Sequence, residues 1–287
     1  MAVFRRGVHF GSYGTADDGP AVFDRLYAAV ETAEAAGFDA ISVPDHVHQN
    51  RVGGGPDSPM FEAYTLLGAL AARTSSVRLL ALVSPVTMRS PGLLAKAVTT
   101  VDVLSRGRAV LGLGAGWDAA EAEAYGISFP PTGERMDRLD EALRICRAMS
   151  SQPQASVSGA HYQVSDARNS PRPVSGRIPI LVGGGGERRT LDLVARYADA
   201  CNLGGDAATV ARKLGILAQH CERVGRDPDE ITRTVFATAI PDDLAEFARQ
   251  LASYAQAGAQ GVVLLGRPGD AGRLKALGEV AAGAFPG

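Results

Sequence analysis

Short apolar runs alternate along this chain with longer segments in which apolar residues recur at helical spacing. The runs are continuous, which is typical of strands buried on both faces of a parallel sheet. We expect strands at residues 7–11, 38–43, 77–83, 108–114, 178–182, 198–203, 233–239 and 261–265. The helical patterns lie between and after them, at residues 22–33, 61–73, 94–101, 134–149, 188–197, 207–224, 242–257 and 270–282.

This alternation predicts eight strand–helix units. Parallel strands need crossover helices, and eight such units in 287 residues fit a TIM (β/α)8 barrel better than an open sheet. The spacing breaks once, between the fourth and fifth strands, where a helix is followed by segment 150–177, rich in Ser, Pro and Gln. We expect this segment to be an insertion with a small hairpin around Val157 and residues 162–164. No other boundary is visible, so we expect a single domain over residues 1–287.

Composition and charge narrow the class of protein. The 29 basic and 31 acidic residues give a net charge of −2, whereas a nucleic-acid-binding protein normally carries a basic excess for phosphate contacts. No apolar stretch reaches the roughly 18–20 residues that span a bilayer. Cys146, Cys201 and Cys221 form no CxxC pair, so we expect free thiols in a reducing cytoplasm. We therefore expect neither nucleic acid nor membrane as a partner.

The strongest local signal for a ligand is a run of four glycines, Gly183, Gly184, Gly185 and Gly186, that opens directly onto a predicted helix. Glycines allow positive φ and close backbone approach. Their N–H groups and the helix N-terminus make an anion site, for which phosphate is the usual ligand. Arg188, Arg189 and Thr190 offer further donors. The alternative is a plain flexible loop, and no Gly-Lys-Ser/Thr follows that would make a Walker A motif.

Asp45 and His46 follow the second predicted strand, where the active site of such a barrel lies. Histidine titrates near neutrality, and a neighbouring carboxylate can orient it and favour the imidazolium. A structural or cofactor-contacting role for His46 stays open beside proton transfer. The pair His46 and His48 resembles the metal pair of amidohydrolase barrels, but that family needs further ligands after later strands. We therefore expect no metal.

A second glycine-rich stretch, residues 112–117, follows the fourth predicted strand. It resembles a dinucleotide fingerprint loosely, but its third glycine comes one residue early and no ribose-binding acid follows. We expect instead that Gly112, Gly114 and Gly116 leave room for a flat ring at the barrel mouth. Trp117, the only Trp, either forms a wall of the site or belongs to ordinary barrel packing.

Together, these blocks resemble the bacterial luciferase-like family, and more closely its branch that uses coenzyme F420, an 8-hydroxy-5-deazaflavin. The resemblance covers nearly the whole chain, but members that use flavin mononucleotide (FMN) share the architecture, so FMN stays an alternative cofactor. The residues that carry the resemblance are Asp45, His46, 82–91 (LVSPVTMRSP), 104–108, 111–117 (LGLGAGW), Glu121, 125–127, Arg135, 141–143, 178–186 (IPILVGGGG), 195–199 and Asn202.

The resemblance implies a TIM barrel, usually dimeric, with a non-proline cis peptide that falls here at Leu82–Val83. It places the ring of the cofactor over the barrel mouth and its phosphate at the four glycines. In a relative that acts on sugar phosphates, the His matching His46 is a base, but the Glu used as acid falls at Trp117, so that substrate chemistry is not carried over. The expected cofactor contacts are Asp45, Leu82, Val83, Thr87, Gly116, Trp117, Gly183, Gly184, Gly185, Gly186 and Asn202.

We therefore expect an F420-dependent oxidoreductase that transfers a hydride between the deazaflavin C5 and a small organic substrate, with His46 and Asp45 as catalytic residues. Two alternatives stay open: an FMN-dependent two-component monooxygenase of the same family, and a non-catalytic cofactor-binding protein. The expected partners are a small-molecule substrate and a second copy of the chain in a homodimer. The substrate itself is not indicated, because loops 47–59 and 150–177 carry no specific signature.

Overall fold

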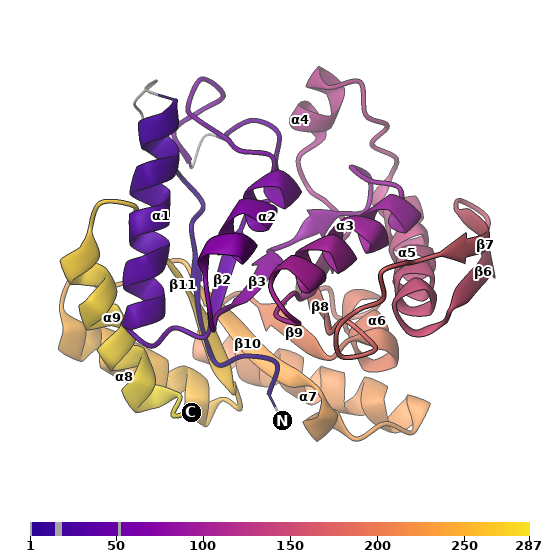
Figure 1. Cartoon of the computed structure of the whole chain (residues 1–287). Coiled ribbons are helices and arrows are strands. Elements are labelled where there is room, and N and C mark those ends of the chain that lie inside the picture. The colour runs from indigo at the N-terminus through magenta and orange to yellow at the C-terminus, as the bar shows by residue number, and fades with distance from the viewer. Residues whose placement is uncertain (1, 15–18, 51–52) are drawn as a thin grey trace.

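The computed structural model describes residues 2–14, 19–50 and 53–287. Within this part of the chain, nine parallel strands form one sheet in the order β3-β2-β1-β11-β10-β9-β8-β5-β4. The sheet closes on itself where Leu79 of β3 pairs with Ala109, just before β5. Helices surround this ring (Figure 1), so the expected TIM barrel is confirmed. Its strands are β1 (Arg6–His9), β2 (Ala40–Val43), β3 (Arg78–Ala81), β4 (Ser84–Pro85), β5 (Leu111–Gly114), β8 (Ile180–Gly183), β9 (Ala200–Leu203), β10 (Thr232–Ala237) and β11 (Gly261–Leu265).

The third predicted strand, at residues 77–83, is divided in two. Its first part, β3, pairs with β2, and its continuation, β4, pairs with β5. Between them lies a cis peptide bond at Leu82–Val83, which confirms the bond expected from the family resemblance. A second cis bond, Ser170–Pro171, was not expected. The bulge at Leu82–Val83 brings two apolar side chains to the mouth of the barrel.

The predicted helices are present, with some changes at their ends. Pro20 begins α1, and Gly37, with a φ of 82°, follows its last turn. The short α4 was missed, because its alanines and glutamates have no apolar periodicity; the carboxylate of Asp118 caps it by accepting the N–H of Glu121. The helices are α1 (Pro20–Ala35), α2 (Ala63–Arg73), α3 (Pro91–Leu104), α4 (Ala119–Ala124), α5 (Thr132–Ser151), α6 (Thr190–Tyr197), α7 (Ala207–Val224), the 3₁₀ turn η2 (Pro228–Glu230), α8 (Leu244–Gln256) and α9 (Ala271–Ala284).

Two apolar clusters stabilise the barrel. The larger lies between the strands and the surrounding helices, and the smaller fills the inside of the ring. Adjacent residues of β3 show the division: Leu79 belongs to the outer cluster and Leu80 to the inner one, because successive side chains of a strand point to opposite faces. Leu82, Val83 and Phe236 pack against the inner cluster from the side of the mouth. The barrel is therefore a filled core with an apolar floor under its mouth.

Segment 150–177 contains the expected hairpin. Strands β6 (Gln154–Ser158) and β7 (Gln163–Arg168) pair antiparallel, and the hairpin projects from the side of the barrel beside α5 (Figure 1). The buried carboxylate of Glu141 on α5 accepts the N–H groups of Ala160, His161 and Tyr162 at 2.7–2.9 Å. The hairpin turn is thus fixed to α5. In the other long loop, 47–59, residues 51 and 52 lie outside the described residues.

Two expectations from the sequence concern membrane-spanning helices and the state of the cysteines. No helix among the described residues is long and apolar enough to cross a bilayer. Cys146, Cys201 and Cys221 are buried free thiols. Burial raises the pKa of Cys146 and of Cys201 to about 12, so both stay protonated at neutral pH. Burial also raises the pKa of Cys221, so none of the three has the character of a nucleophile.

Candidate functional site

A cavity of about 440 Å³ lies at the carboxyl ends of the barrel strands, where the sequence placed the active site. It is lined by His46 and by all the expected cofactor contacts except Asp45 and Thr87. The lining also includes Thr190, which the sequence suggested as a further donor, and Pro85 and Arg135, which carry the family resemblance. Thr132, Met136 and Phe236 line it too and were not selected from the sequence. The cavity therefore brings together residues that lie far apart in the sequence.

The floor of the cavity is the bulge at Leu82–Val83. A Cβ on Gly114 would lie 2.6 Å from the Cγ2 atom of Val83, and a Cβ on Gly183 would lie 2.8 Å from its Cγ1 atom. A Cβ on Gly112 would collide with the backbone oxygen of Ala81. The expectation that Gly112 and Gly114 leave room for a flat ring is therefore wrong, because the space beside them is taken by the bulged strand.

The four glycines form one side of the cavity. Gly184 has a φ of 110°, which favours glycine. A Cβ on Gly185 would collide with Nζ of Lys213, and one on Gly186 would lie 2.7 Å from Oγ1 of Thr190. Backbone amides, the start of α6, a hydroxyl and an ammonium group therefore converge here. This combination suits an anion such as phosphate.

Lys213 was missed by sequence reasoning, which named Arg188, Arg189 and Thr190 as further donors. Arg189 does not serve this loop, because its guanidinium donates to the carboxylate of Asp137 and to the backbone carbonyl of Gly133. Lys213 comes from α7, in the unit that follows the glycine run, and no short-range pattern pointed to it. Asn202 lies beside the glycines as expected, and its backbone carbonyl oxygen accepts the N–H of Gly184 at 3.3 Å.

His46 contacts a carboxylate, but not the one expected. Its Nδ1 lies 2.6 Å from Oε2 of Glu121, whose other oxygen accepts the N–H of Val47 at 2.7 Å. Asp45 is buried and pairs instead with Arg89, through two hydrogen bonds of 2.7 and 2.9 Å. The expectation that Asp45 orients His46 is therefore wrong, because both oxygens of Asp45 are occupied by the guanidinium.

The two partners shift each other's protonation. Burial lowers the pKa of His46, but the hydrogen bond and negative charge of Glu121 outweigh it, so this pKa lies above its usual value. Burial raises the pKa of Glu121, but the His46 contact and the N–H of Val47 outweigh it, so this pKa lies below its usual value. The contact therefore favours the charged forms of both groups, and the Nε2 edge of the ring lies on the side away from Glu121.

Asp118, Glu121 and His46 lie close enough together to resemble a set of metal ligands. Their atoms, however, are engaged with one another and with N–H groups. Glu121 accepts from His46 and Val47, and Asp118 accepts the N–H of Glu121 at 3.1 Å. The closeness of the three side chains is explained by these hydrogen bonds.

Trp117 and Thr87 both lie close to Gly116, but only Trp117 lines the cavity. Trp117 is 65% exposed, and its ring meets that of His46 edge-on at 5.5 Å, so it forms a wall of the cavity. Thr87 lies behind the glycine, with its hydroxyl oxygen 3.5 Å from the position of a Cβ on Gly116. It does not reach the cavity, and any contribution from Thr87 would act through Gly116.

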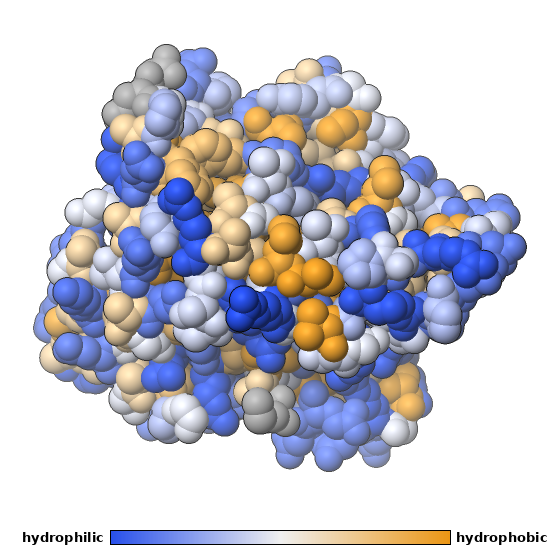
Figure 2. Space-filling model, viewed as in Figure 1, coloured by the Kyte–Doolittle hydropathy of each residue, from blue (hydrophilic) through white to orange (hydrophobic). Residues whose placement is uncertain are grey.

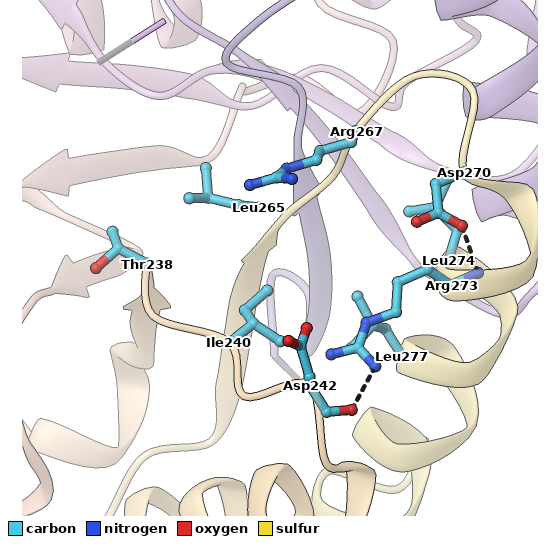
Figure 3. Close-up of a pocket in the computed structure, with 9 residues that line it drawn as sticks. All are labelled: Thr238, Ile240, Asp242, Leu265, Arg267, Asp270, Arg273, Leu274 and Leu277. Atoms are coloured by element: carbon cyan, nitrogen blue, oxygen red, sulfur yellow. Dashed lines mark hydrogen bonds between the residues drawn. The ribbon is translucent and has the colours of Figure 1, made fainter.

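A second cavity, of about 290 Å³, lies between α9, the end of β11 and the loop that follows β10 (Figure 3). Arg273 reaches from α9 to the backbone carbonyls of Pro241 and Asp242, and the carboxylate of Asp270 caps α9 by accepting the N–H of Arg273. Arg273 therefore connects α9 to the loop that follows β10. No residue that the sequence selected lines this cavity, and the central one is the candidate site.

Comparisons with known proteins identify the family of this chain. A family model described as luciferase-like monooxygenase matches residues 1–283. An uncharacterized protein of Mycobacterium tuberculosis (strain H37Rv) is 30% identical over 234 residues, which cover 77% of this chain and 82% of that protein. The F420-dependent glucose-6-phosphate dehydrogenase of Kineococcus radiotolerans is 33% identical over 207 residues, which cover 71% of this chain and 60% of that protein.

Two solved structures show the same fold at low sequence identity. One is an F420-dependent secondary alcohol dehydrogenase in complex with an F420-acetone adduct, with a TM-score of 0.81, 17% identity and 98% of each chain covered. The other is the oxygenating constituent of 3,6-diketocamphane monooxygenase from Pseudomonas putida in complex with FMN, with a TM-score of 0.77, 15% identity and 99% of each chain covered. The chain belongs to the luciferase-like monooxygenase family, whose members are F420- or flavin-dependent oxidoreductases.

Proposed function

We propose that this protein is a coenzyme F420-dependent oxidoreductase that transfers a hydride between the deazaflavin C5 and a small organic substrate. The observation that carries the proposal is the pairing, in one cavity, of the Leu82–Val83 bulge with the four-glycine run beside Lys213. The bulge offers an apolar surface to a planar ring, and the glycine run offers donors to a phosphate. A curated relative named as an F420-dependent dehydrogenase supports the deazaflavin over FMN.

The residues present fit this cofactor. Leu82 and Val83 would lie behind the ring, with Gly116 and Trp117 at its edge. The phosphate would be held by the backbone of residues 183–186, the hydroxyl of Thr190 and the ammonium group of Lys213, which lie against the same loop. Asn202 would hold that loop in place through its bond to Gly184. Asp45 and Thr87, also expected as contacts, would support the site from behind.

The cofactor supplies the redox chemistry when it is bound, because its C5 gives or takes a hydride. The chain supplies position and charge. His46 presents its Nε2 edge to the cavity and is the side chain placed to move a proton there. Trp117 covers one side of the cavity and limits the space open to a substrate.

A binding titration tests this proposal. The purified protein is titrated with F420 and, separately, with FMN while cofactor fluorescence is followed. We expect saturable F420 binding and no FMN binding. Lys213→Ala should weaken F420 binding roughly ten-fold or more, the usual effect of losing a charge-assisted hydrogen bond. Arg212→Ala is the matched control, because Arg212 precedes Lys213 but pairs with Glu187.

Two results would overturn the assignment. Tight FMN binding without F420 binding would favour the FMN-dependent monooxygenase, for which the FMN-bound structural relative is the supporting observation. That enzyme needs oxygen, so substrate turnover under anaerobic conditions would exclude it. Cofactor that binds but never changes redox state with any electron donor would favour a binding protein without catalysis.

We infer further that the protein works in the cytoplasm as a homodimer, each chain a single domain. Leu93, Val103 and Leu104 on α3 and the nearby Val174 are exposed, and apolar side chains gather over α3 in the middle of the face shown in Figure 2. Exposed apolar area of this kind marks association surfaces. Light scattering on a size-exclusion column should give twice the mass of the chain, and Leu104→Glu should halve it. An unchanged monomeric mass would contradict the homodimer.

A further inference from the structure

The contact between His46 and Glu121 joins two parts of the chain that lie 75 residues apart. The Glu121 side chain is 3% exposed and that of His46 is 13% exposed. A buried carboxylate is costly unless it is paired and hydrogen-bonded. The Glu121 carboxylate is therefore shielded from solvent and contacts His46, which lines the cavity.

Glu121 is fixed from three sides. It accepts the N–H of Val47 at 2.7 Å, the N–H of His48 at 3.4 Å and the Nδ1 contact of His46 at 2.6 Å. Its own backbone is held by the capping carboxylate of Asp118 at the start of α4. The carboxylate thus connects α4 to the loop after β2, and one of its contacts there is His46, which lines the cavity.

We propose that Glu121 is the positioning residue of the site: its carboxylate accepts a hydrogen bond from the Nδ1–H of His46, turns Nε2 toward the cavity and keeps the ring protonated, so that His46 serves as a proton donor. This inference rests on the proposed function. Of the two ring nitrogens, Nδ1 is occupied, and Nε2 makes no hydrogen bond within the described residues. A ring that donates through Nδ1 has only Nε2 left for a substrate.

The surrounding charges support this assignment. Glu121 and Asp118 face His46 from α4 and its cap, and both favour the imidazolium. Asp45, from the same loop, acts in the same direction, but its charge is largely offset by Arg89. His9, from the end of β1, is neutral at physiological pH and adds no opposing charge. These negative charges outweigh burial and leave the pKa of His46 above its usual value.

A protonated His46 indicates the substrate class. An acceptor that gains a hydride at carbon gains negative charge on the adjacent oxygen, nitrogen or carbon, and the Nε2 proton neutralises it. With the hydride from the reduced cofactor, this proton completes a reduction by two electrons and two hydrogens, and His46 is left neutral. We therefore expect a substrate that is reduced at a carbonyl, an imine or a polarised alkene.

The test is an NMR titration of the ¹⁵N-histidine-labelled full chain, with His46→Ala used to assign the signal. In the wild type we expect both ring nitrogens of His46 to be protonated at pH 7. In Glu121→Gln the pKa of His46 should fall by about 1–3 units, the usual size of an opposite-charge interaction. Glu123→Gln, on the exposed side of the same helix, is the matched control and should leave it unchanged.

A neutral His46 in the wild type at pH 7 would overturn the inference, and so would equal titration of His46 in wild type and Glu121→Gln. The wild-type measurement keeps the inference testable if Glu121→Gln fails to fold. With an acceptor in hand, the basic limb of the kcat profile should shift down by the same amount in Glu121→Gln, with KM little changed. The apo titration needs no cofactor, so its failure is distinguishable from a failure of F420 to bind.

Discussion

The ends of β1 and β2 lie side by side at the barrel mouth, and each is associated with a histidine in a different state. His9 is buried at the end of β1, and its Nδ1 contacts the neutral hydroxyl of Ser42 at 3.0 Å. Burial, and then the nearby charge of His46, lower the pKa of His9 to about 4. His46, just after β2, has Glu121 as its partner and has a raised pKa. The same side chain is held neutral in one place, whereas in the other its partner favours the charged form.

The pKa values of the two histidines differ mainly because their Nδ1 atoms have different partners, and less because the rings are buried to different extents. A hydroxyl offers no net charge, so burial decides the state of His9, whereas the carboxylate of Glu121 outweighs burial at His46. A histidine at a barrel mouth is therefore no sign of proton transfer by itself. The carboxylate behind it is the better sign, and it came from a different strand–helix unit.

Removal of each histidine should separate a chemical role from a structural one. We expect His46→Ala to lower turnover by roughly 10²–10⁴-fold, the usual contribution of a proton-transferring side chain, with a much smaller change in the Kd of the cofactor. His48→Ala is the control, because only its backbone N–H contacts Glu121. The measurement is steady-state turnover beside the fluorescence titration. An equal loss of turnover and cofactor affinity would mean that His46 binds the cofactor and moves no proton.

His9 should instead make the fold sensitive to acid. The unfolded chain protonates this residue near its ordinary pKa of 6.5, but the native state does so only at about 4. Stability is therefore complete above pH 6.5 and falls as the pH drops toward 4, by roughly 3 kcal/mol from this group. Urea unfolding across this range should show the loss in the wild type and a smaller one in His9→Gln. His161→Gln, on the exposed hairpin, should behave as the wild type, and equal slopes in all three would contradict the assignment.

The strand positions, most helices and the barrel itself could be predicted, because continuous apolar runs and helical periods are local properties of the sequence. The missed elements have no such pattern: α4 is made of alanines and glutamates, and β4 has two residues. The cis bond at Leu82–Val83 was available only through the family resemblance, since no local pattern distinguishes it. The fold could therefore be predicted wherever the pattern lies within a short stretch of the sequence.

The sequence predicted which strand ends carry the candidate site, but it did not predict which side chains pair there. The glycine run and His46 stand at strand ends and were found, whereas Lys213 and Glu121 reach the site from helices of other units. Adjacency in sequence suggested Asp45 as the partner of His46, but consecutive side chains in an extended chain point to opposite sides. That geometry puts Asp45 against Arg89 and leaves His46 to Glu121.

Asp45 and His46 therefore offer the last and smallest contrast. Asp45→Asn removes one partner of a buried ion pair, and Arg89 stays attached to Glu62 at the more exposed end. We expect unfolding to become easier by about 2 kcal/mol, below the usual cost of breaking a buried pair because Arg89 is partly exposed. Turnover should change only a few-fold, in contrast to His46→Ala. Thermal unfolding and steady-state kinetics give both quantities, with Asp57→Asn on an exposed loop as the control. A large loss of turnover at unchanged stability would restore Asp45 to the catalytic role that the sequence suggested, since the ion pair with Arg89 would then be serving the chemistry of the cavity from behind.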